Sequence, residues 1–506
     1  MISAAFVLPI SIHTQLLHKI ATLIYASLTA FLLFPLQIAA GSELGDVPNI
    51  ILILADDLGY AELGCYGQTK IKTPHLDQLA RDGMRFTQFY SGAPVCAPAR
   101  CTLMTGKHSG HAYTRNNADY KDPEKLAAKL GWEAFTGQQP IPAEAVTIAE
   151  LLKARGYATG AIGKWGLGNF GTSGDPNKQG FDFFYGYTCQ RHAHNHYPKF
   201  LWQNGVKQVL VGNDGGATGA IHSQERFTAE AVQFLRDHKD GPFFLYLPFI
   251  IPHASIQVPD AELAQYQDMP EGDAAPRDGY KPHPRPHAGY AAMVSFLDKA
   301  VGEILAELDK LKLADNTLVL FTSDNGPTHG RVGGADSDFF ASSGPLRGRK
   351  GSVYEGGLRV PLIARWPGKI KAASESEHVA AFWDMLPTLC DIAGSDGLQL
   401  PDDIDGTTFA PTLLGQRQQK EHGYLYWEFP GYGGQQAIRV GDWKAVRTEM
   451  HGAKGPLKTQ LYLLSDDIGE TKDVAAAHPE VVTRLEILLQ NARTPSKQFP
   501  FQAIDP

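Results

Sequence analysis

The stretch "NIILILADD", residues 49–57, joins a short apolar run to two adjacent carboxylates. Three later segments repeat this pattern: "YATGAI" precedes Lys164, "FFLYL" precedes His253, and "TLVLF" precedes Asp324 and Asn325. Continuous apolar runs of this length are typical of strands that are buried on both faces of a parallel sheet. We therefore expect strands at residues 49–54, 157–162, 243–247 and 317–321.

Helical patterns separate these runs. "TPHLDQLARDGM" offers Thr73 as an N-cap, "TIAELLKARGY" offers a capping box of Thr147 and Glu150, and residues 290–311 are amphipathic. The alternation of strands and helices predicts a doubly wound α/β domain. After about Gly394 the pattern changes to short antiparallel strands followed by a helix, which predicts a smaller α+β domain.

Polar side chains collect where the predicted strands end, which is where open α/β sheets bind their ligands. This pattern gathers six residues at one edge of the sheet: Asp56, Asp57, Lys164, His253, Asp324 and Asn325. An isolated pair of aspartates is more commonly a loop or capping feature. Three carboxylates with one amide oxygen, however, form an all-oxygen set that suits calcium or magnesium and argues against zinc.

The stretch "GAPVCAPARCTLMTG", residues 92–106, contains Cys96 two residues before Pro98. Proline suits the first turn of a helix, so Cys96 is expected at a helix N-terminus, where backbone N–H groups favour an anion. A buried thiol is the usual fate of a lone cysteine. A papain-like thiol protease is a further alternative, but the flanking pattern of that family is missing.

Four cationic or proton-carrying residues complete the candidate site: Arg100, Lys164, His253 and Lys350. Each of them alone is more commonly a surface or structural residue. Together they would surround a small tetrahedral dianion, and a cationic pocket beside a hard cation indicates sulfate or phosphate ester chemistry.

The composition narrows the class of partner and the compartment. The 506 residues carry a net charge of −8 without a basic run, which argues against nucleic acid as a partner. Five cysteines without a C-x-x-C pair do not form a disulfide scaffold or a structural zinc site. Residues 20–40 are uncharged and end in small residues, which predicts a signal peptide at 1–40 and an exported, periplasmic or secreted protein without a stable membrane partner. An uncleaved anchor is the alternative, because the run is long enough to span a bilayer.

"CAPARCTLMTG" matches the sulfatase motif of Cys or Ser, any residue, Pro, any residue and Arg, closing with Thr-Gly. "ILILADDLGY", "GYATGAIGKWGLG", "FTSDNGP" and "RGRKGSVYEGGLRVPLIARWPG" follow in a similar order. Over almost all of residues 47–490 the chain resembles type I, formylglycine-dependent sulfatases of the arylsulfatase family, in the alkaline-phosphatase superfamily. The resemblance implies a large mixed, mostly parallel sheet sandwiched by helices at 46–395 and a C-terminal α+β domain on an antiparallel sheet at 396–506.

The resemblance also implies roles for individual residues. Cys96 would be oxidised to formylglycine (3-oxoalanine) by a maturation enzyme, and its hydrate would attack sulfur. Arg100 would hold the formylglycine, Lys164 and Lys350 would grip sulfate oxygens, and His253 would protonate or polarise the leaving oxygen. One calcium ion would be bound by Asp56, Asp57, Cys96, Asp324 and Asn325.

One position departs from the family pattern. Many members read G-K-W-H-L-G, and their histidine contacts the formylglycine hydroxyl as a candidate base, whereas this chain has Gly166 there. "CQRHAHNHYP" lies downstream and offers His192, His194 and His196. We predict that His194 is the replacement. Sulfate binding and a plain loop role are its open alternatives.

Resemblance to bacterial polysaccharide and glycosaminoglycan sulfatases predicts a sulfated sugar as substrate, with a galactose- or N-acetylgalactosamine-type 4-sulfate preferred. Residues 108–117 and 328–338 are expected to shape the sugar subsite. Two other functions stay open. One is a formylglycine-dependent phosphodiesterase or phosphonate hydrolase, and the other is an inactive carbohydrate-binding paralogue, which only Gly166 supports.

Overall fold

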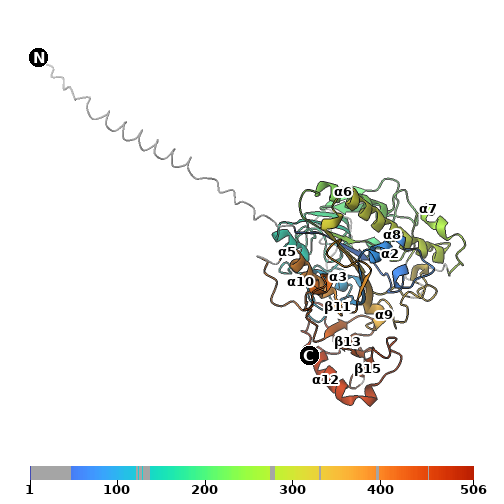
Figure 1. Cartoon of the computed structure of the whole chain (residues 1–506), viewed down its shortest axis with the longest axis vertical. Coiled ribbons are helices and arrows are strands. Elements are labelled where there is room, and N and C mark those ends of the chain that lie inside the picture. The colour runs from blue at the N-terminus through green and yellow to red at the C-terminus, as the bar shows by residue number, and fades with distance from the viewer. Residues whose placement is uncertain are drawn as a thin grey trace. The chain divides into compact units, whose positions relative to one another are not determined.

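Within the described residues, eleven strands form one mixed sheet in the computed structural model (Figure 1). The structure describes residues 47–120, 137–273, 280–329, 332–394, 398–453 and 455–505, with the single positions 1, 124 and 128. Apart from Met1, the predicted signal peptide lies outside these residues. The predicted domain limits at 46 and 395/396 also lie outside them, so both stay predictions.

The strand order is β10–β2–β9–β8–β1–β7–β3–β4–β5–β6, and β11 pairs with β2. The central strands β8, β1, β7, β3 and β4 run parallel, while β9, β5 and β6 run antiparallel to their neighbours. The predicted mixed, mostly parallel sheet is confirmed, and the four predicted strands are β1, β3, β7 and β8. The bounds are β1 Asn49–Ala55, β2 Met84–Tyr90, β3 Ala158–Lys164, β4 Phe183–Tyr187, β5 Phe200–Gln203, β6 Val206–Val209, β7 Phe243–Pro248, β8 Thr317–Ser323, β9 Arg359–Arg365, β10 Ser374–Ser376 and β11 Ala380–Ala381.

Helices cover both faces of this sheet, which explains the unbroken apolar runs. Ile51 and Ile53 of β1 pack into one core cluster with residues of α8, while Ile50 and Leu52 are equally buried and point to the opposite face. Helices α2, α6 and α7 contact α8, and α3, α5 and α10 contact one another. The helices are α2 Pro74–Arg81, α3 Cys96–Thr105, α5 Ile148–Ala154, α6 Ser223–Asp237, α7 Asp260–Leu263, α8 Pro286–Lys310, α9 Glu355–Leu358, α10 Met385–Ile392, α11 Ala410–Leu413 and α12 Pro479–Asn491.

Local sequence signals account for several helix ends. Thr147 and Glu150 form the predicted capping box at the start of α5. Helix α2 begins after Thr73 as expected, but the Thr73 hydroxyl accepts from the Gly64 N–H at 2.8 Å instead of capping the helix. Short 3-10 helices lie at Gly64–Tyr66, His192–His194, Ala264–Tyr266, Ala314–Asn316, Val332–Gly334, Phe382–Asp384 and Ala475–Ala477.

A second, antiparallel sheet lies towards the C-terminus, as predicted, and is buried on both faces. Trp427 packs in one cluster with Tyr90 from the end of β2, and the other face packs on Leu485 of α12. Lys444 is fully buried between Glu355 of α9 and Glu470, at 2.8 and 3.0 Å. This sheet is therefore fixed to the large sheet by apolar and ionic contacts. Its strands are β12 Leu425–Phe429, β13 Gln435–Val440, β14 Trp443–Arg447 and β15 Gln460–Leu463.

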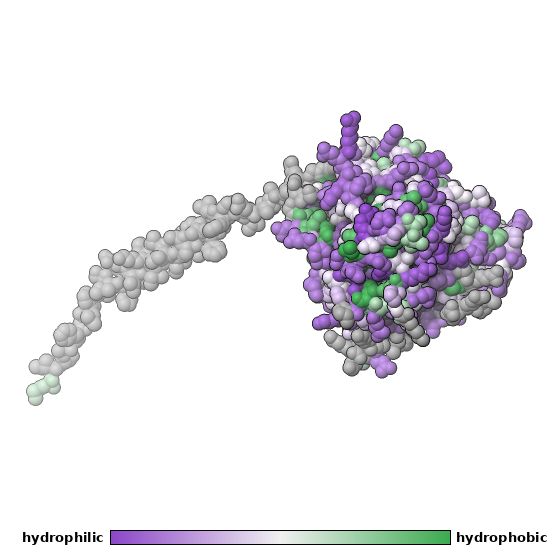
Figure 2. All heavy atoms as spheres, turned by 90° about the horizontal axis from the view of Figure 1, so that it is seen from below, coloured by the Kyte–Doolittle hydropathy of each residue, from purple (hydrophilic) through white to green (hydrophobic). Residues whose placement is uncertain are grey.

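Hydrophilic side chains dominate the face of the molecule shown in Figure 2, with apolar atoms scattered between them. That mixture is ordinary for a folded protein surface. No helix among the described residues is both long enough and apolar enough to cross a lipid bilayer.

Candidate active site

The carboxyl ends of β1 and β8 bring the two acidic clusters of the sequence together. Ala55 of β1 pairs with Ser323 of β8, so the residues after each strand begin side by side. The Asp57 N–H donates to Asp324 Oδ1 at 3.1 Å, and Asn325 Nδ2 donates to Asp57 Oδ1 at 2.8 Å. Burial is nearly complete for the four predicted oxygen ligands, Asp56, Asp57, Asp324 and Asn325.

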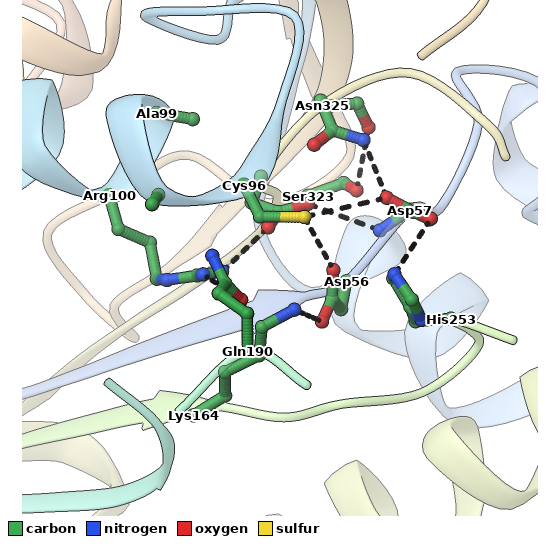
Figure 3. A network of polar contacts seen from close by, with 12 residues as sticks. Asp56, Asp57, Cys96, Ala99, Arg100, Lys164, Gln190, His253, Ser323 and Asn325 are labelled. Atoms are coloured by element: carbon green, nitrogen blue, oxygen red, sulfur yellow. Dashed lines mark hydrogen bonds and ion pairs between the residues drawn. The ribbon is translucent and has the colours of Figure 1, made fainter. Parts of the chain in front are cut away.

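Helix α3 begins at Cys96 and directs its thiol towards the same carboxylates (Figure 3). The Sγ atom lies 3.3 Å from Asp56 Oδ1, 3.9 Å from Asp57 Oδ1 and 3.3 Å from Lys350 Nζ. Burial, and then the charges of Asp324 and Asp56, raise the pKa of the Cys96 thiol. The unmodified side chain is therefore a neutral thiol, which is a poor nucleophile.

Arg100 lies one turn further along α3, and each of its three guanidinium nitrogens donates a hydrogen bond. Nε donates to the Trp165 carbonyl oxygen at 3.0 Å, Nη1 to Asp324 Oδ2 at 2.8 Å and Nη2 to Gln190 Oε1 at 2.9 Å. The guanidinium group therefore fixes the position of Asp324 relative to the helix that carries the cysteine.

Two buried lysines pair with the aspartates that follow β1. Lys164 Nζ lies 2.5 Å from Asp56 Oδ2, and Lys350 Nζ lies 2.8 Å from the Asp57 carboxylate. Burial alone would raise the pKa of Asp56, but Lys164 and the other nearby cations hold it well below its ordinary value. Burial and the neighbouring Asp56 charge raise the pKa of Asp324 to about 7. The carboxylates thus compete for ionisation, and a bound cation would relieve that competition.

A pair of stacked histidines lies beside these charges. His253 donates from Nδ1 to the Ala254 carbonyl oxygen, and its Nε2 lies 3.6 Å from Asp57 Oδ2. The His194 ring stacks on it with centroids 4.9 Å apart and planes 18° apart. Burial is the main cause that lowers the pKa of both histidines. The charge of Lys350 lowers the pKa of His253 further, and the charge of His253 lowers that of His194 further. Both imidazoles are neutral in this arrangement.

These side chains surround a cavity of about 260 Å³. The predicted site residues that line it are Cys96, Lys164, His194, His253 and Lys350. The two segments expected to shape a sugar subsite also reach it, through Asn117, Thr328, His329 and Val332. Sequence reasoning missed three other residues of the wall, Gln190, Tyr280 and Tyr432. Gln190 lies in the segment "CQRHAHNHYP", whose three histidines are the more obvious candidates for chemistry, and Tyr432 is an aromatic residue within the glycine-rich turn "PGYGG".

Gln190 fills the space beside Gly166, where the family pattern has histidine. Gly166 has a φ of 72°, and a Cβ added there would lie 3.0 Å from Arg100 Nη2 and 3.3 Å from Gln190 Cδ and Nε2. Gln190 Nε2 also donates a hydrogen bond to Asn117 Oδ1 at 3.5 Å. An amide pair therefore occupies this part of the site, and His194 stands with His253 instead.

The donor atoms of the site fit a hard cation. Asn325 Oδ1 is buried and accepts no hydrogen bond from any residue that the structure describes, although buried polar atoms are almost always satisfied. Within the part of the chain that the structure describes, Asp56, Asp57, Cys96 and His253 form a buried group with ligand atoms within 4.8 Å of one another. Carboxylate and amide oxygens that meet at one point are the ligands calcium prefers.

Comparisons with known proteins agree with this chemistry. The sulfatase family model matches residues 48–395, and the model of the N-sulphoglucosamine sulphohydrolase C-terminal region matches 349–494. Arylsulfatase A of Homo sapiens is 34% identical over 502 residues, covering 90% of this chain and 89% of that protein. The N-acetylgalactosamine-6-O-sulfatase of Bacteroides thetaiotaomicron is 30% identical over 534 residues, covering 88% and 93%.

A solved structure extends the likeness to three dimensions. The crystal structure of Ps i-CgsB in complex with k-i-k-neocarrahexaose superposes with a TM-score of 0.71 at 28% identity, covering 88% of this chain and 94% of that one. The family generally uses formylglycine and calcium, and the acidic cluster around Cys96 fits both. The predicted family and fold class are thereby confirmed: the chain belongs to the sulfatase family and is a sulfuric ester hydrolase.

Proposed function

We propose that this sulfatase removes sulfate from a galactose- or N-acetylgalactosamine-type sugar, with the 4-sulfate as the preferred position. A relative named N-acetylgalactosamine-6-O-sulfatase and a structural neighbour bound to a neocarrahexaose support a sulfated carbohydrate. Because that relative is named as a 6-O-sulfatase, the 6-sulfate is the alternative position against which the 4-sulfate has to be tested.

The observation that carries the proposal is the setting of Cys96. Its Sγ lies between the Asp56 carboxylate and Lys350 Nζ, each 3.3 Å away, and it lines the cavity. A nucleophile made from this side chain would therefore meet a sulfate group where lysines can bind its oxygens and where oxygen ligands can hold a cation.

Each group around the cavity has one proposed role. A formylglycine made from Cys96 by a formylglycine-generating or other maturation enzyme would supply the nucleophilic hydrate. Calcium would supply charge stabilisation, held by Asp56, Asp57, Cys96, Asp324 and Asn325. Lys164 and Lys350 are proposed to bind the sulfate oxygens, because both residues line the cavity together with Cys96.

The remaining groups orient these parts. His253 is proposed to protonate or polarise the oxygen that joins sulfur to the sugar. Because its Nδ1–H is engaged by the Ala254 carbonyl oxygen, Nε2 must first take up a proton before it can donate to that oxygen. Arg100 positions Asp324 and the residue at 96. His194 stacks on His253 and is proposed to replace the histidine base of the family pattern, with sulfate binding as its alternative.

The test is sulfate release by protein produced together with a maturation enzyme, with the state of residue 96 read by peptide mass spectrometry. The substrates are sulfated monosaccharides that differ only in the 4- or 6-position, and Cys96→Ala is the control variant. We expect release from a galactose-type sulfate and none from Cys96→Ala. Faster turnover of an aryl phosphodiester than of an aryl sulfate, or sulfate release by Cys96→Ala, would contradict the proposal.

Export to the periplasm or beyond the cell belongs to the same proposal, because a polymeric substrate lies outside the cytoplasm. The uncharged run at 20–40 supports it. N-terminal sequencing of the protein recovered after cell fractionation tests it, and a cytoplasmic protein that keeps its first forty residues would contradict it.

A further inference from the structure

We propose that Tyr432 forms a stacking surface for the sugar ring that carries the sulfate, an inference that rests on the proposed function. Tyr432 lies on the loop Pro430–Gly434, which joins β12 to β13 of the smaller sheet. It lines the same cavity as Cys96, and 58% of its surface is exposed. The smaller sheet would thus contribute part of the substrate site.

Neighbouring residues hold the Tyr432 ring in place. The Phe429 ring meets it edge-on with centroids 5.3 Å apart, and the His329 ring lies 5.5 Å away. The hydroxyl is 3.4 Å from His329 Nε2. Gly351 allows the close approach, because a Cβ there would lie 2.3 Å from Tyr432 Cε2. An exposed aromatic ring is therefore fixed in position before any ligand arrives.

The backbone of this tyrosine is strained, with a φ of 47°. A left-handed conformation is rare for a bulky residue, and such strain collects at ligand-binding sites. The exposed ring gains little from burial that would offset the strain. Binding a ligand explains why a large aromatic side chain stands at this position.

The position of Tyr432 suits the sugar and not the sulfate. Gly351, on which the ring rests, follows Lys350, and Lys350 Nζ lies 3.3 Å from Cys96 Sγ. A sulfate bound by the lysines would lie at the Cys96 end, and the sugar ring would extend towards the exposed tyrosine. The cavity, about 260 Å³, is smaller than the roughly 300–1,000 Å³ typical of drug-sized ligands, so it suits a sulfate with one ring.

The chemistry of the wall fits a monosaccharide ring. One face of a sugar ring carries C–H groups, which pack on an aromatic face, while its hydroxyls need polar partners. The cavity offers Tyr432 for the first need, and Asn117, Tyr280 and His329 for the second. We therefore assign the ring that bears the sulfate to this surface.

Two substitutions separate the aromatic face from the hydroxyl. Tyr432→Asn removes the ring but keeps a residue that tolerates a positive φ, and Tyr432→Phe keeps the ring and removes the hydroxyl. Ile487→Ala, at an exposed apolar position of α12, is the matched surface control. The measurements are kcat and KM for the sulfated monosaccharide that the wild type hydrolyses, and the inhibition constant of inorganic sulfate.

We expect Tyr432→Asn to raise KM about tenfold, equivalent to about 1.4 kcal/mol, with kcat within about twofold of wild type. The inhibition constant of inorganic sulfate should not change, and Ile487→Ala should behave as wild type. Tyr432→Phe should raise KM by less than about twofold, because the stacking ring remains. An unchanged KM in Tyr432→Asn, an equal rise in Tyr432→Phe, or a fall in kcat alone would overturn the inference.

Two further readouts keep the test decisive. If Tyr432→Asn loses the thermal unfolding transition of the wild type, Tyr432→Gly, which also accepts a positive φ, carries the same expectation. If the wild type releases sulfate and the Tyr432 variants have the same KM, only the assignment of Tyr432 is wrong. A wild type that releases no sulfate from any sugar defeats the proposed function.

Discussion

Replacing Gly166 with histidine, the residue of the family pattern, should damage this enzyme instead of improving it. The added Cβ would lie 3.0 Å from Arg100 Nη2 and 3.3 Å from Gln190 Nε2. A φ of 72° costs a non-glycine residue about 1–2 kcal/mol. The imidazole also needs the space that Gln190 fills.

The second cost is the hydrogen bond that Gln190 accepts from Arg100 at 2.9 Å. Hydrogen bonds to charged groups contribute about 1.5–3 kcal/mol, so Gly166→His should lower the free energy of unfolding by about 2.5–5 kcal/mol. Activity should fall as well, because Arg100 also holds Asp324 at 2.8 Å.

A double-mutant cycle measures the coupling directly. Urea unfolding and kcat/KM are measured for Gly166→His, Gln190→Ala and the double variant. The double variant should recover at least about 1 kcal/mol relative to additivity, because removing the glutamine frees space for the imidazole. Gly441→Ala is the control for the backbone term, since Gly441 has a φ of 57° and nothing within 4 Å of its added Cβ.

Two results would refute this reasoning. One is a Gly166→His variant as stable and active as the wild type, which would mean that Gln190 does not fill the space. The other is strict additivity of the two substitutions, within about 0.5 kcal/mol, which would mean that the two positions do not compete for the same volume.

Three further outcomes are expected. Lys444→Met should cost about 3–5 kcal/mol in urea unfolding, because it leaves Glu470 buried without its cation and removes the nearer of the two cations that pair with Glu355; a loss below about 1 kcal/mol would contradict the described packing of the two sheets. Burial lowers the pKa of His422, but Asp384 at 2.8 Å outweighs this and raises it above 6.5, so its stabilisation is present below about pH 6.5 and is lost as the pH rises through the folded pKa. Unfolding measured from pH 6 to 9 should therefore show a smaller loss in His422→Gln than in the wild type, and identical slopes would exclude the pair. Calcium at a hundredfold excess over its Kd should stabilise the chelator-treated enzyme by about 2.7 kcal/mol in calorimetry, and the absence of any shift would argue against a calcium site.

The central part of the fold could be predicted because its signals are local. β1, β3, β7 and β8 are buried on both faces, so they read as apolar runs, and a parallel sheet brings their carboxyl ends to one edge. Asp56 and Asp324 therefore meet, although they are 268 positions apart in the sequence. The sulfatase motif around Cys96 added the family and the predicted modification.

The flanking strands gave no comparable signal. β2 is only partly buried at three of its seven positions, and β5 and β6 have four residues each. β6 lies in the stretch 205–219, whose glycines favour a loop. β2 pairs with the distant β9, and hydrogen bonds between such remote segments leave no periodic trace in the sequence. β5 and β6 pair with each other as a hairpin across Asn204 and Gly205, and strands of four residues are too short to show a clear alternation.

The family, the central parallel strands and the residues that meet at their ends follow from the order of residues along the chain, because a buried strand and a contiguous motif are properties of neighbouring residues. Folding in three dimensions was needed to place Gln190 in the space beside Gly166 and to bring Tyr432 of the smaller sheet to the cavity of Cys96. Both facts depend on which side chains from distant segments compete for one volume, and packing of that kind is settled only when the whole chain has folded.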